Sequence, residues 1–398
     1  MVHVSTTDYG GAYKAAARIN ESMKACGADS MLLLRTKYNR NNLGEVVFHS
    51  GCQSLYSKFK NVINLLLSRG EVISDYCGTN ITNNILINEA DVIVLHWVNS
   101  FIAYKNVEQL LSMSKKIIWV MHDMWLFTGG CHCDQYCGGY EHECGWCPLL
   151  KRSKEVDISR RNFIRKINML SKGEITLVGP SQWITDCAKK SNITQGKKIV
   201  RIPNPINLKC FKPMVIKSDT FLKYHINTKK KVVLFGAVNS LKDANKGYGR
   251  LINALRLLPK EQYIAVVFGN KNEDHYLKQF IETIFLGYIS DESELVEIYN
   301  MADVFVAPSN QENYSNAVLE AQACGVPVVA FDIGGMSDMI QHLENGYLAN
   351  YQDIEDLAQG IVFCASNKEK LGYYARVRSE KENDYKVIGN MYYKICES

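Results

Sequence analysis

The 398-residue sequence lacks a long uninterrupted apolar run, although 46% of its residues are hydrophobic. No stretch approaches the roughly 18 apolar residues that a membrane-spanning helix needs. The start, MVHVSTTDYGGAYK, also lacks a basic segment followed by an apolar one, so we expect no secretory leader. These absences argue against an integral membrane protein, and we expect a cytoplasmic one.

Internal repeats and low-complexity tracts are also missing, and the length suits two domains of roughly 150 to 200 residues. Three prolines in eleven residues, within VRIPNPINLKCFKPM, interrupt both strands and helices and predict a hinge near 203–213. We therefore expect one domain over 1–205 and a second over 206–375. The tail, 376–398, is expected to be one polar helix that packs back toward the first domain, with an apolar stripe at Tyr385, Ile388, Met391 and Tyr392.

Short Val- and Ile-rich runs alternate with helical stretches in both halves of the chain. In the first half these runs are ILINEADVIVLHW, KKIIWVMHD and EITLVGPS, and in the second KKVVLFGAV, YIAVVFGN, ADVFVAPS and VPVVAFDIGG. This alternation predicts parallel strands with helical crossovers. The expected fold class is α/β, with two doubly wound, Rossmann-like domains. Ligands of such sheets bind beyond the carboxyl ends of the strands, and two facing sheets would form a cleft.

The net charge of +5 conceals an asymmetry between the two halves. Residues 1–205 carry 25 Lys and Arg against 17 Asp and Glu, whereas the rest carries 21 against 24. A basic half suits nucleic acid, an anionic membrane surface or phosphorylated substrates, and charge alone does not choose among them. A nucleic-acid module is disfavoured because the chain has no basic strand with interleaved aromatics and no known binding motif.

The segment ENYSNAVLE places two carboxylates after the strand DVFVAPS. Glu312 falls in the loop that follows the strand, and Glu320 falls one turn into the helix AVLEAQAC. Ser315 or Asn316 can cap this helix, whose free amides and dipole favour an anion such as a diphosphate. Glu320 is then placed to accept hydrogen bonds from a ribose diol. The alternative is that both acids lie on a solvated helix face.

Two further loops of the second half follow strands. Gly334 and Gly335 end the strand VPVVAF, where they form either a second amide cradle or a tight turn that needs positive φ. Lys246, in the loop leaving the first strand of this half, could neutralise a diphosphate or be an ordinary surface lysine.

The first half has polar residues at equivalent places. His122 and Asp123 end the strand KIIWVMHD, and Gly10 and Gly11 lie between the first strand and its helix. A lone histidine is often a hydrogen-bonded structural residue, but the carboxyl end of a strand is where α/β enzymes place their chemistry.

Taken together, these residues resemble the retaining glycosyltransferases of family 4, which have the two-domain GT-B fold. The resemblance spans nearly the whole chain and rests on Gly10, Gly11, His122, Asp123, IPNPI at 202–206, Phe211, Pro213, Lys246, Gly247, Glu312, Glu320, Gly325, Pro327, Gly334 and Gly335. The stretch from DMWLFTGGC to CGWCP looks like the branch containing colanic acid and related polysaccharide glycosyltransferases.

The resemblance implies a nucleotide-diphosphate sugar held mainly by the second domain. Glu320 would bind the ribose and Lys246 the diphosphate, while Gly334 and Gly335 would back the nucleotide. The sugar and phosphate region would contact Glu312, Asn313, Tyr314, Ser315, Asn316 and Ala317, largely through backbone amides. His122, Asp123 and the Gly10–Gly11 loop would approach the sugar from the first domain, where the acceptor would also lie.

The implied chemistry is metal-independent sugar transfer with retention of configuration, and neither half contains the Asp-x-Asp signature of metal-dependent transferases. The acceptor would be a lipid-linked saccharide in surface polysaccharide biosynthesis, and no cofactor would be needed for catalysis. One departure concerns Gly236, which is followed by Ala237 where the family commonly has Arg; Lys242 could supply the charge. The alternative activity is a nucleotide-sugar epimerase or hydrolase of the same fold.

Five of the thirteen cysteines fall within 131–147. The spacing C-x5-C-x6-C-x2-C of Cys131, Cys137, Cys144 and Cys147 suits a structural zinc ion, with Cys133 left over. The alternatives are reduced thiols and a disulfide. A site with four protein ligands would brace the loop that follows His122 and Asp123.

Two segments suggest contact with an anionic membrane surface. Within 52–69, Leu55, Phe59, Val62, Ile63 and Leu66 share one helical face, with basic residues elsewhere, and 151–166 adds a second basic run. We expect peripheral binding to the inner face of the cell membrane. The alternative for 52–69 is an amphipathic helix packed on the sheet.

Overall fold

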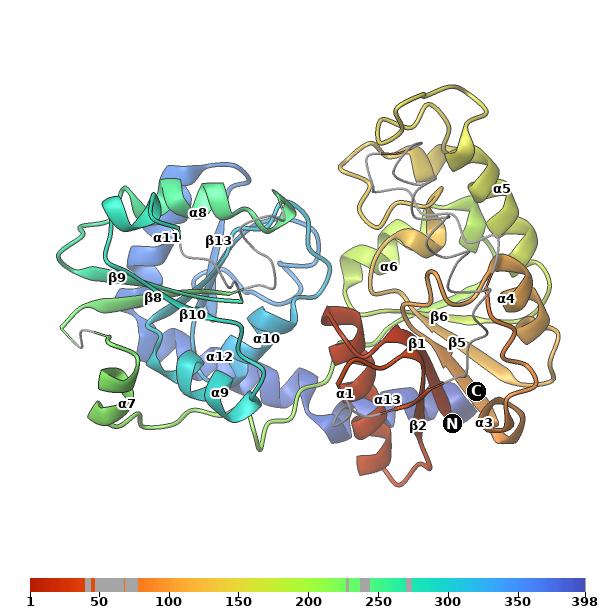
Figure 1. Cartoon of the computed structure of the whole chain (residues 1–398), viewed down its shortest axis with the longest axis horizontal. Helices are drawn as coiled ribbons and strands as arrows, with labels where there is room; N and C mark the ends of the chain where they lie inside the picture. Colours follow the sequence, from red (N-terminus) through yellow and green to blue (C-terminus); the bar gives the residue numbers. More distant parts are fainter. Residues whose placement is uncertain are drawn as a thin grey trace. The chain divides into compact units, whose positions relative to one another are not determined.

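The computed structural model describes residues 1–39, 44–46, 68, 78–226, 229–236, 244–269 and 274–397. The chain divides into two compact units (Figure 1). Unit 1 comprises Met1–Asn204 together with Ile388–Ser398, and unit 2 comprises Pro205–Val387.

Unit 1 contains a parallel sheet in the order β3-β2-β1-β4-β5-β6-β7. Its strands are β1 (Val2–Thr7), β2 (Met31–Thr36), β3 (Glu45–Val46), β4 (Val92–Leu95), β5 (Lys116–Val120), β6 (Thr176–Gly179) and β7 (Lys198–Arg201). The order reverses between β1 and β4, so the connections leaving these strands run in opposite directions across the sheet. Such a reversal opens a crevice at the carboxyl ends of the two strands.

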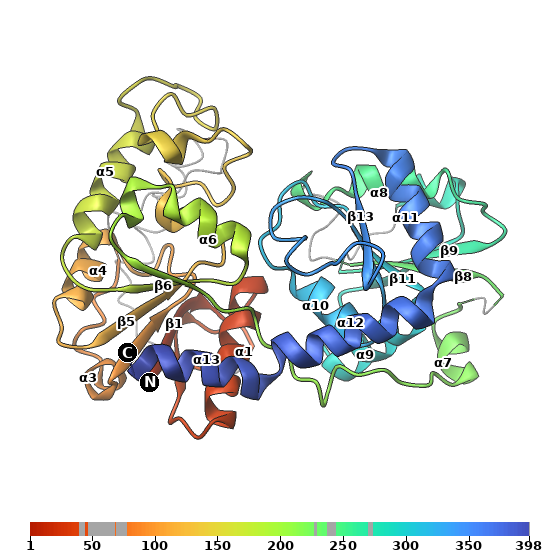
Figure 2. The ribbon, with the colours of Figure 1, turned by 180° about the vertical axis from the view of Figure 1, so that it is seen from behind.

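Helices cover both faces of this sheet. They are α1 (Gly11–Ala25), α3 (Ile85–Glu89), α4 (Tyr104–Leu111), α5 (Ile158–Leu170), α6 (Gln182–Lys189) and α13 (Tyr385–Glu397). Apolar residues of α4, α5 and α6 form one core with the sheet, and those of α1 and α13 form another. The C-terminal helix α13 buries Ile388 and Tyr392 beside Ile19 of α1, and Figure 2 shows these two helices side by side.

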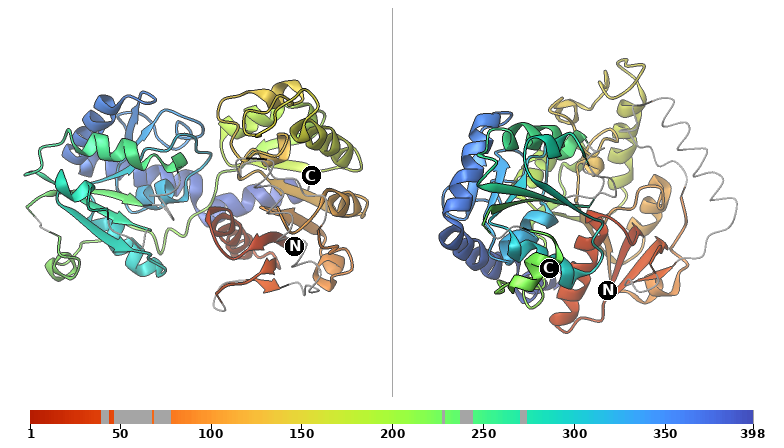
Figure 3. Two further views of the ribbon diagram at one scale, coloured as in Figure 1. Left: turned by 45° about the horizontal axis from the view of Figure 1, so that its top comes forward. Right: turned by 60° about the vertical axis from the view of Figure 1, so that its left-hand side comes forward.

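Unit 2 repeats the arrangement, with the strand order β10-β9-β8-β11-β12-β13. Its strands are β8 (Lys231–Gly236), β9 (Tyr263–Phe268), β10 (Thr283–Gly287), β11 (Val304–Ala307), β12 (Val328–Phe331) and β13 (Gly346–Ala349). All pairs are parallel, and the two views in Figure 3 show the strands of each sheet running alongside one another. Here the order reverses between β8 and β11.

The helices of unit 2 are α7 (Ser218–Lys223), α8 (Tyr248–Leu255), α9 (Glu292–Met301), α10 (Asn316–Ala323), α11 (Ile354–Ser366) and α12 (Lys368–Asn383). Helices α8 and α11 cover one face of the sheet, and α9, α10 and α12 cover the other (Figure 1). The four inner strands β8, β9, β11 and β12 are almost wholly buried, as expected for a parallel sheet covered on both faces, whereas the outer strands β10 and β13 are part-exposed.

These sheets confirm the predicted fold class of two doubly wound domains, but two local predictions were wrong. Residues 85–89, expected at the start of a strand, form helix α3 because Asn84 caps it through the amide of Leu86. The tail is not one helix: α12 ends at Asn383 and α13 begins at Tyr385, with Asp384 extended between them.

The predicted amphipathic helix over 52–69 lies outside the described residues, apart from Ser68. In the described part of the chain, no helix is both long and apolar enough to cross a bilayer.

Candidate functional site

The crevice of unit 2 contains an ion pair between two of the predicted site residues. Lys246 ends the short turn η4 (Ala244–Lys246) that precedes α8, and Glu312 lies in the loop between β11 and α10. The Lys246 Nζ donates to Glu312 Oε2 at 2.7 Å, with the side chains 30% and 18% exposed. The pair therefore lies at the reversal point of the sheet and remains open to solvent.

Backbone contacts fix the two loops against each other. Asn245 donates its side-chain amide to the carbonyl of Gln311, and its own carbonyl accepts from the amide of Asn310. Gly247 has φ +70°, and a Cβ there would lie 1.8 Å from the carbonyl oxygen of Pro308. Only glycine therefore allows this approach, which positions Lys246 beside Glu312.

Gly334 and Gly335 hold Glu312 from the other side. The amide of Gly335 donates to the carbonyl of Glu312 at 2.9 Å. Gly334 has φ +53°, and a Cβ there would lie 2.1 Å from the same carbonyl oxygen. The loop after β12 thus packs directly against the backbone of Glu312.

Helix α10 begins as predicted, with Ser315 as its cap, accepting a hydrogen bond from the amide of Val318. Ser315, Asn316 and Ala317 are part-exposed, so the start of this helix is accessible. Side chains before it point elsewhere: the Tyr314 hydroxyl accepts from Asn383 at 2.8 Å, and Asn313 is 8% exposed.

Glu320 is less accessible than the sequence suggested. It is 2% exposed, and its Oε2 accepts a hydrogen bond from the hydroxyl of Tyr299 on α9 at 3.0 Å. Tyr299 is itself fully buried. The hydroxyl orients the carboxylate, and the predicted role of Glu320 in binding ribose stays a prediction.

In unit 1, the corresponding crevice is bordered by the loop between β1 and α1. Gly10, with φ +89°, precedes the first residue of α1, Gly11, and a Cβ on Gly10 would meet no atom within 4 Å. The Thr6 hydroxyl donates to the carbonyls of Trp97 and Asn99, which ties the end of β1 to the end of β4.

Three histidines from neighbouring strands form a chain that ends at His122. His3 Nδ1 lies 2.9 Å from His96 Nε2, and His96 Nδ1 lies 2.9 Å from His122 Nε2, with successive rings stacked. His3 and His96 are 0% and 2% exposed, whereas His122 is part-exposed and lines a pocket with Asn99 and Asp123. Sequence reasoning identified only His122, because residues on three strands become neighbours through sheet order alone.

Burial keeps this chain neutral. It lowers the pKa of His122 to about 4 and that of His3 to about 3, and it lowers the pKa of His96 well below its ordinary value. Asp123 partly opposes the effect at His122. At neutral pH, His122 is therefore an uncharged imidazole, suited to accepting or donating a hydrogen bond.

The chain also has a preferred direction of donation. The Nε2 of His3 is buried and has no hydrogen-bond partner in the described part of the chain. A buried N–H without a partner is rarer than a buried acceptor without one. The favoured tautomers thus place a proton on Nδ1 of each ring, so that His96 donates to Nε2 of His122 and the Nδ1 of His122 carries the remaining proton.

Asp123 is held by a second set of contacts. Its Oδ2 lies 2.6 Å from His132 Nδ1, its Oδ1 accepts from the amide of Trp125 at 2.8 Å, and His132 Nε2 lies 3.3 Å from the side-chain amide of Asn99. Burial alone would raise the pKa of Asp123, but the His132 charge and hydrogen bond, with the Trp125 amide, lower it overall. Asp123 is therefore an ionised carboxylate. The sequence analysis selected Asp123 as a site residue but gave no role to its partner His132.

The cysteines lie in the loop that connects β5 to α5. Cys131, Cys137, Cys144 and Cys147 line one pocket and form no disulfide in the described structure. Within the described part of the chain, no group of three or more His, Cys, Asp or Glu side chains is already arranged to hold a metal ion.

Comparison with known proteins identifies one segment of the chain. Residues 217–378, which make up most of unit 2, match the family model described as glycosyl transferases group 1. This segment is similar to group 1 glycosyl transferases. It contains Lys246, Glu312, Glu320, Gly334 and Gly335, so every predicted site residue of unit 2 falls inside the matched range.

Curated relatives match at lower coverage. One is the N,N'-diacetylbacillosaminyl-diphospho-undecaprenol alpha-1,3-N-acetylgalactosaminyltransferase of Campylobacter jejuni, 26% identical over 48% of this chain and 52% of its own length. Another is the capsular polysaccharide biosynthesis glycosyltransferase CapM of Staphylococcus aureus, 26% identical over 42% of this chain and 46% of its own. The chain thus spans about half the length of the curated relatives it matches.

A solved structure extends the likeness to the whole chain. The Anabaena protein HepE, in complex with UDP and glucose, gives a TM-score of 0.65 at 17% identity and covers 100% of this chain and 99% of its own. This likeness shows the fold, which is the GT-B fold.

The structure therefore brings the predicted site residues into two groups, one in each unit. Lys246, Glu312, Gly334 and Gly335 gather at the reversal point of unit 2, and His122 and Asp123 share a pocket in unit 1. Ala237 and Lys242, at the predicted departure from the family, lie outside the described residues. Convergence of both groups on one site stays a prediction.

Proposed function

We propose that this protein is a retaining glycosyltransferase that moves a sugar from a nucleotide-diphosphate sugar to a saccharide acceptor. The observation that carries the proposal is the Lys246–Glu312 pair at the reversal point of unit 2, inside the segment that matches group 1 glycosyl transferases. Doubly wound sheets bind nucleotides at this place. The donor would therefore lie at the carboxyl ends of β8, β11 and β12.

The diphosphate would lie between Lys246 and the start of α10. Ser315, Asn316 and Ala317 are part-exposed at a helix start, where an anion is stabilised, and Lys246 would add one positive charge. Glu312, held by Lys246 and by the amide of Gly335, would accept hydrogen bonds from the sugar. Glu320, oriented by the Tyr299 hydroxyl, would bind the ribose.

The reaction breaks the bond between C1 of the sugar and the phosphate oxygen and forms a bond between C1 and the acceptor oxygen. Negative charge grows on the departing phosphate, so Lys246 and the amides at α10 would stabilise the transition state. The departing phosphate would take the acceptor proton on the same face of the ring, which retains the configuration. No step in this scheme requires a divalent metal.

His122 would orient the sugar. Its imidazole is neutral at physiological pH, and His96 fixes its ring through Nε2, so it is better suited to hydrogen-bonding a hydroxyl than to stabilising ring charge as a cation. Asp123, fixed by His132, would complete the polar wall of this pocket.

The acceptor proposed here is a lipid-linked saccharide in surface polysaccharide biosynthesis. The name of the C. jejuni relative specifies a diphospho-undecaprenol acceptor, and that of the S. aureus relative specifies capsule synthesis. Both suit an enzyme that works at the cytoplasmic face of a membrane.

A surface in unit 1 supports membrane contact. The amide of Trp146 donates to the carbonyl of Lys154, which brings two parts of one loop together. Trp146 is 66% exposed and Val156 49%, and Lys151, Arg152 and Lys154 are exposed nearby. Exposed aromatic and basic side chains together are typical of binding to anionic lipid. Lys166, at the end of the predicted basic run, is buried and takes no part.

The function is tested by screening nucleotide-diphosphate sugars by thermal shift and then offering the best binder with lipid-linked saccharide acceptors. We expect one donor to stabilise the protein and acceptor-dependent release of the nucleotide diphosphate. Donor turnover without any acceptor would indicate an epimerase or hydrolase instead. Absence of binding to every donor would contradict the proposal.

Membrane contact is tested separately by sedimentation with vesicles of neutral or anionic lipid. We expect binding that grows with anionic lipid, falls with salt, and weakens in Trp146→Ala and in Lys151→Glu/Arg152→Glu. Binding that ignores anionic lipid content would refute this part of the proposal and leave the transferase activity untouched.

A further inference from the structure

The loop from Met121 to Asp157 is long but has little regular secondary structure. Among its described residues it contains no strand and only two short 3-10 helices, η1 (Trp125–Phe127) and η2 (Gly139–His142). Of the nine non-glycine residues with positive φ in the described chain, five lie here: Gln135, Tyr136, Glu143, Cys144 and Trp146. Left-handed backbone costs free energy at such residues and persists only where the surroundings enforce it.

Part of this loop packs into the main core of unit 1 through Trp125, Phe127 and Tyr140, but the part around Cys131 and Cys147 has only a small apolar cluster of its own. That cluster consists of the buried residues Cys131, Cys147, Leu149 and Leu150, with Ile158 beside it. Loops of this length without their own secondary structure are uncommon in compact domains unless something else orders them. The cluster itself contains two of the four predicted zinc ligands.

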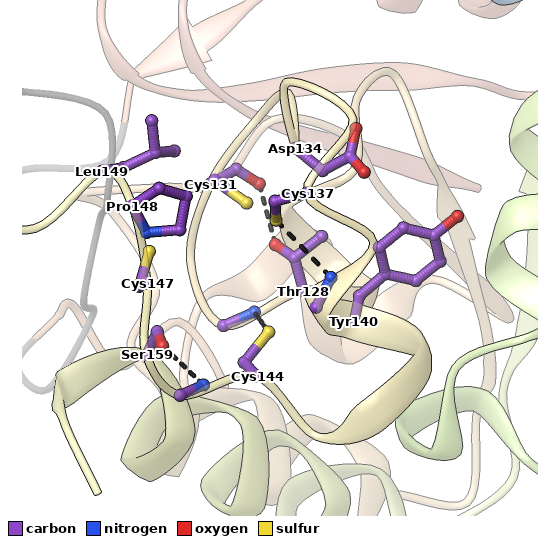
Figure 4. A pocket seen from close by; sticks show the side chains of 13 residues that line it. Thr128, Cys131, Asp134, Cys137, Tyr140, Cys144, Cys147, Pro148, Leu149 and Ser159 are labelled. Atoms are coloured by element: carbon purple, nitrogen blue, oxygen red, sulfur yellow. Dashed lines mark hydrogen bonds between the residues drawn. The ribbon is translucent and has the colours of Figure 1, made fainter. Parts of the chain in front are cut away.

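Four thiols surround one pocket inside the loop. Cys131, Cys137, Cys144 and Cys147 all line it, and Figure 4 shows their side chains arranged around it. Cys133, only two residues from Cys131, does not line it. The structure thus selects the same four cysteines as the spacing and leaves out the same fifth one.

Backbone amides are directed at two of the four sulfurs. Gly129 donates to Cys144 Sγ at 3.3 Å, and Gly139 donates to Cys137 Sγ at 3.5 Å. Amides aimed at sulfur favour the thiolate, which is the form that binds metal.

A buried cation lies beside the pocket. Lys166 of α5 is 0% exposed, donates to the carbonyls of Thr128 and Trp125, and lies 3.7 Å from the centre of the Trp125 ring. A buried ammonium is stabilised by nearby negative charge. A thiolate cluster would supply that charge.

We propose that Cys131, Cys137, Cys144 and Cys147 bind one zinc ion in a closed structural site. The ion replaces the four thiol protons, which leave to solvent, and the resulting centre carries two negative charges. Because the thiols are not yet arranged around a metal, binding would draw them together through side-chain rotation. Four protein ligands leave no open position for catalysis.

Zinc would hold together the two ends of the loop. One end is Cys131, which is next to His132. The other is Cys147, whose backbone amide donates to Asp157 at the start of α5. The proposal does not depend on the transferase activity, because its readout is bound metal.

The test is elemental analysis of untagged protein purified under reducing conditions without chelators. We expect about one zinc ion per chain, as a four-coordinate structural site requires. Cys144→Ser/Cys147→Ser should lose the metal, whereas the matched control Cys133→Ser should keep it. Equal zinc content in the double variant and the control would overturn the assignment of ligands.

Should the double variant fail to fold, the wild-type protein still decides the question. A mercurial that blocks thiols should release zinc to a chromogenic chelator, and cobalt in its place should show thiolate charge-transfer and tetrahedral absorption bands. Two results would overturn the proposal. One is wild-type protein without zinc, and the other is an intact mass lowered by the loss of thiol hydrogens, which would show that the cysteines form disulfides.

Discussion

The Nδ1 of His96 lies 2.9 Å from the Nε2 of His122, and the two rings are stacked. His96 follows β4 and His122 follows β5, so the contact depends on the pairing of these two strands. His3, from β1, continues the chain on the far side of His96. The ring of His122 is therefore oriented by His96, which lines the same pocket, and His96 is in turn held by His3.

His122→Ala should lower the turnover number about 100-fold while changing donor affinity little, because the lost hydrogen bond is made most strongly in the transition state. Steady-state kinetics combined with calorimetric donor binding separates the two effects. An equal loss of turnover and affinity would remove the role assigned to His122.

His96→Leu should lower turnover although His96 has no proposed contact with the donor. The reason is that the variant removes the hydrogen bond that fixes the ring of His122. Nitrogen NMR of labelled histidines should show a single tautomer of His122 in the wild-type protein and a tautomer mixture in the variant. An unchanged tautomer would mean that His96 fills space and does not position His122.

The histidine chain should make stability depend on pH in acid. Folding holds the pKa of His122 near 4 and that of His3 near 3, below their ordinary value of 6.5, so the unfolded chain binds protons that the native chain excludes. Stability is therefore fully present above about pH 7 and is lost as pH falls through 6.5 toward 4. The N-terminal amine and Lys24 act on His3 in the same direction, and Asp123 opposes it at His122.

Each excluded proton contributes a slope of about 1.4 kcal/mol per pH unit. Urea unfolding between about pH 5 and pH 6 should give a shallower slope in His96→Leu than in wild type, by about this amount. Equal slopes would show that His96 accepts a proton normally in the native state.

Gly334→Ala should destabilise unit 2 by about 1 to 3 kcal/mol, because of its positive φ and because the Cβ would meet the Glu312 carbonyl oxygen. Gly249→Ala is the matched control: this glycine lies in α8, and its Cβ would meet nothing within 4 Å. The control should be neutral or gain about 0.5 to 1 kcal/mol from helix propensity. Similar unfolding midpoints for the two variants would show that the loop after β12 moves freely away from Glu312.

Sequence patterns predicted the fold well where strands are buried apolar runs. The strands β5, β6, β8, β9, β11 and β12 were all anticipated, because each is such a run in a parallel sheet. The strands β2, β7, β10 and β13 were not identified, since each is part-exposed. The break at Asp384 was missed because the polar sequence around it continues without Gly or Pro.

The candidate site was only partly predictable. Positions at strand ends, such as Glu312 and His122, follow from local pattern. The hydrogen bond from Tyr299 to Glu320 joins two helices, and the His3–His96–His122 chain joins three strands, so neither has a local signature. His132 is visible in the cysteine-rich segment, but its contact with Asp123 could not be predicted, because that contact requires the loop to fold back.

The central claim, that the reversal point of unit 2 binds a nucleotide-diphosphate sugar, is tested most directly by titrating the best-binding donor into Lys246→Met and Lys231→Met. Lys231 pairs with Asp303 at 3.3 Å near the amino ends of β8 and β11, which are the ends opposite to the proposed donor site. We predict a loss of donor affinity of about 10- to 100-fold in Lys246→Met, the value of a charge-assisted hydrogen bond, and a change within about twofold in Lys231→Met. Equal donor affinity in both variants and the wild type would contradict the account.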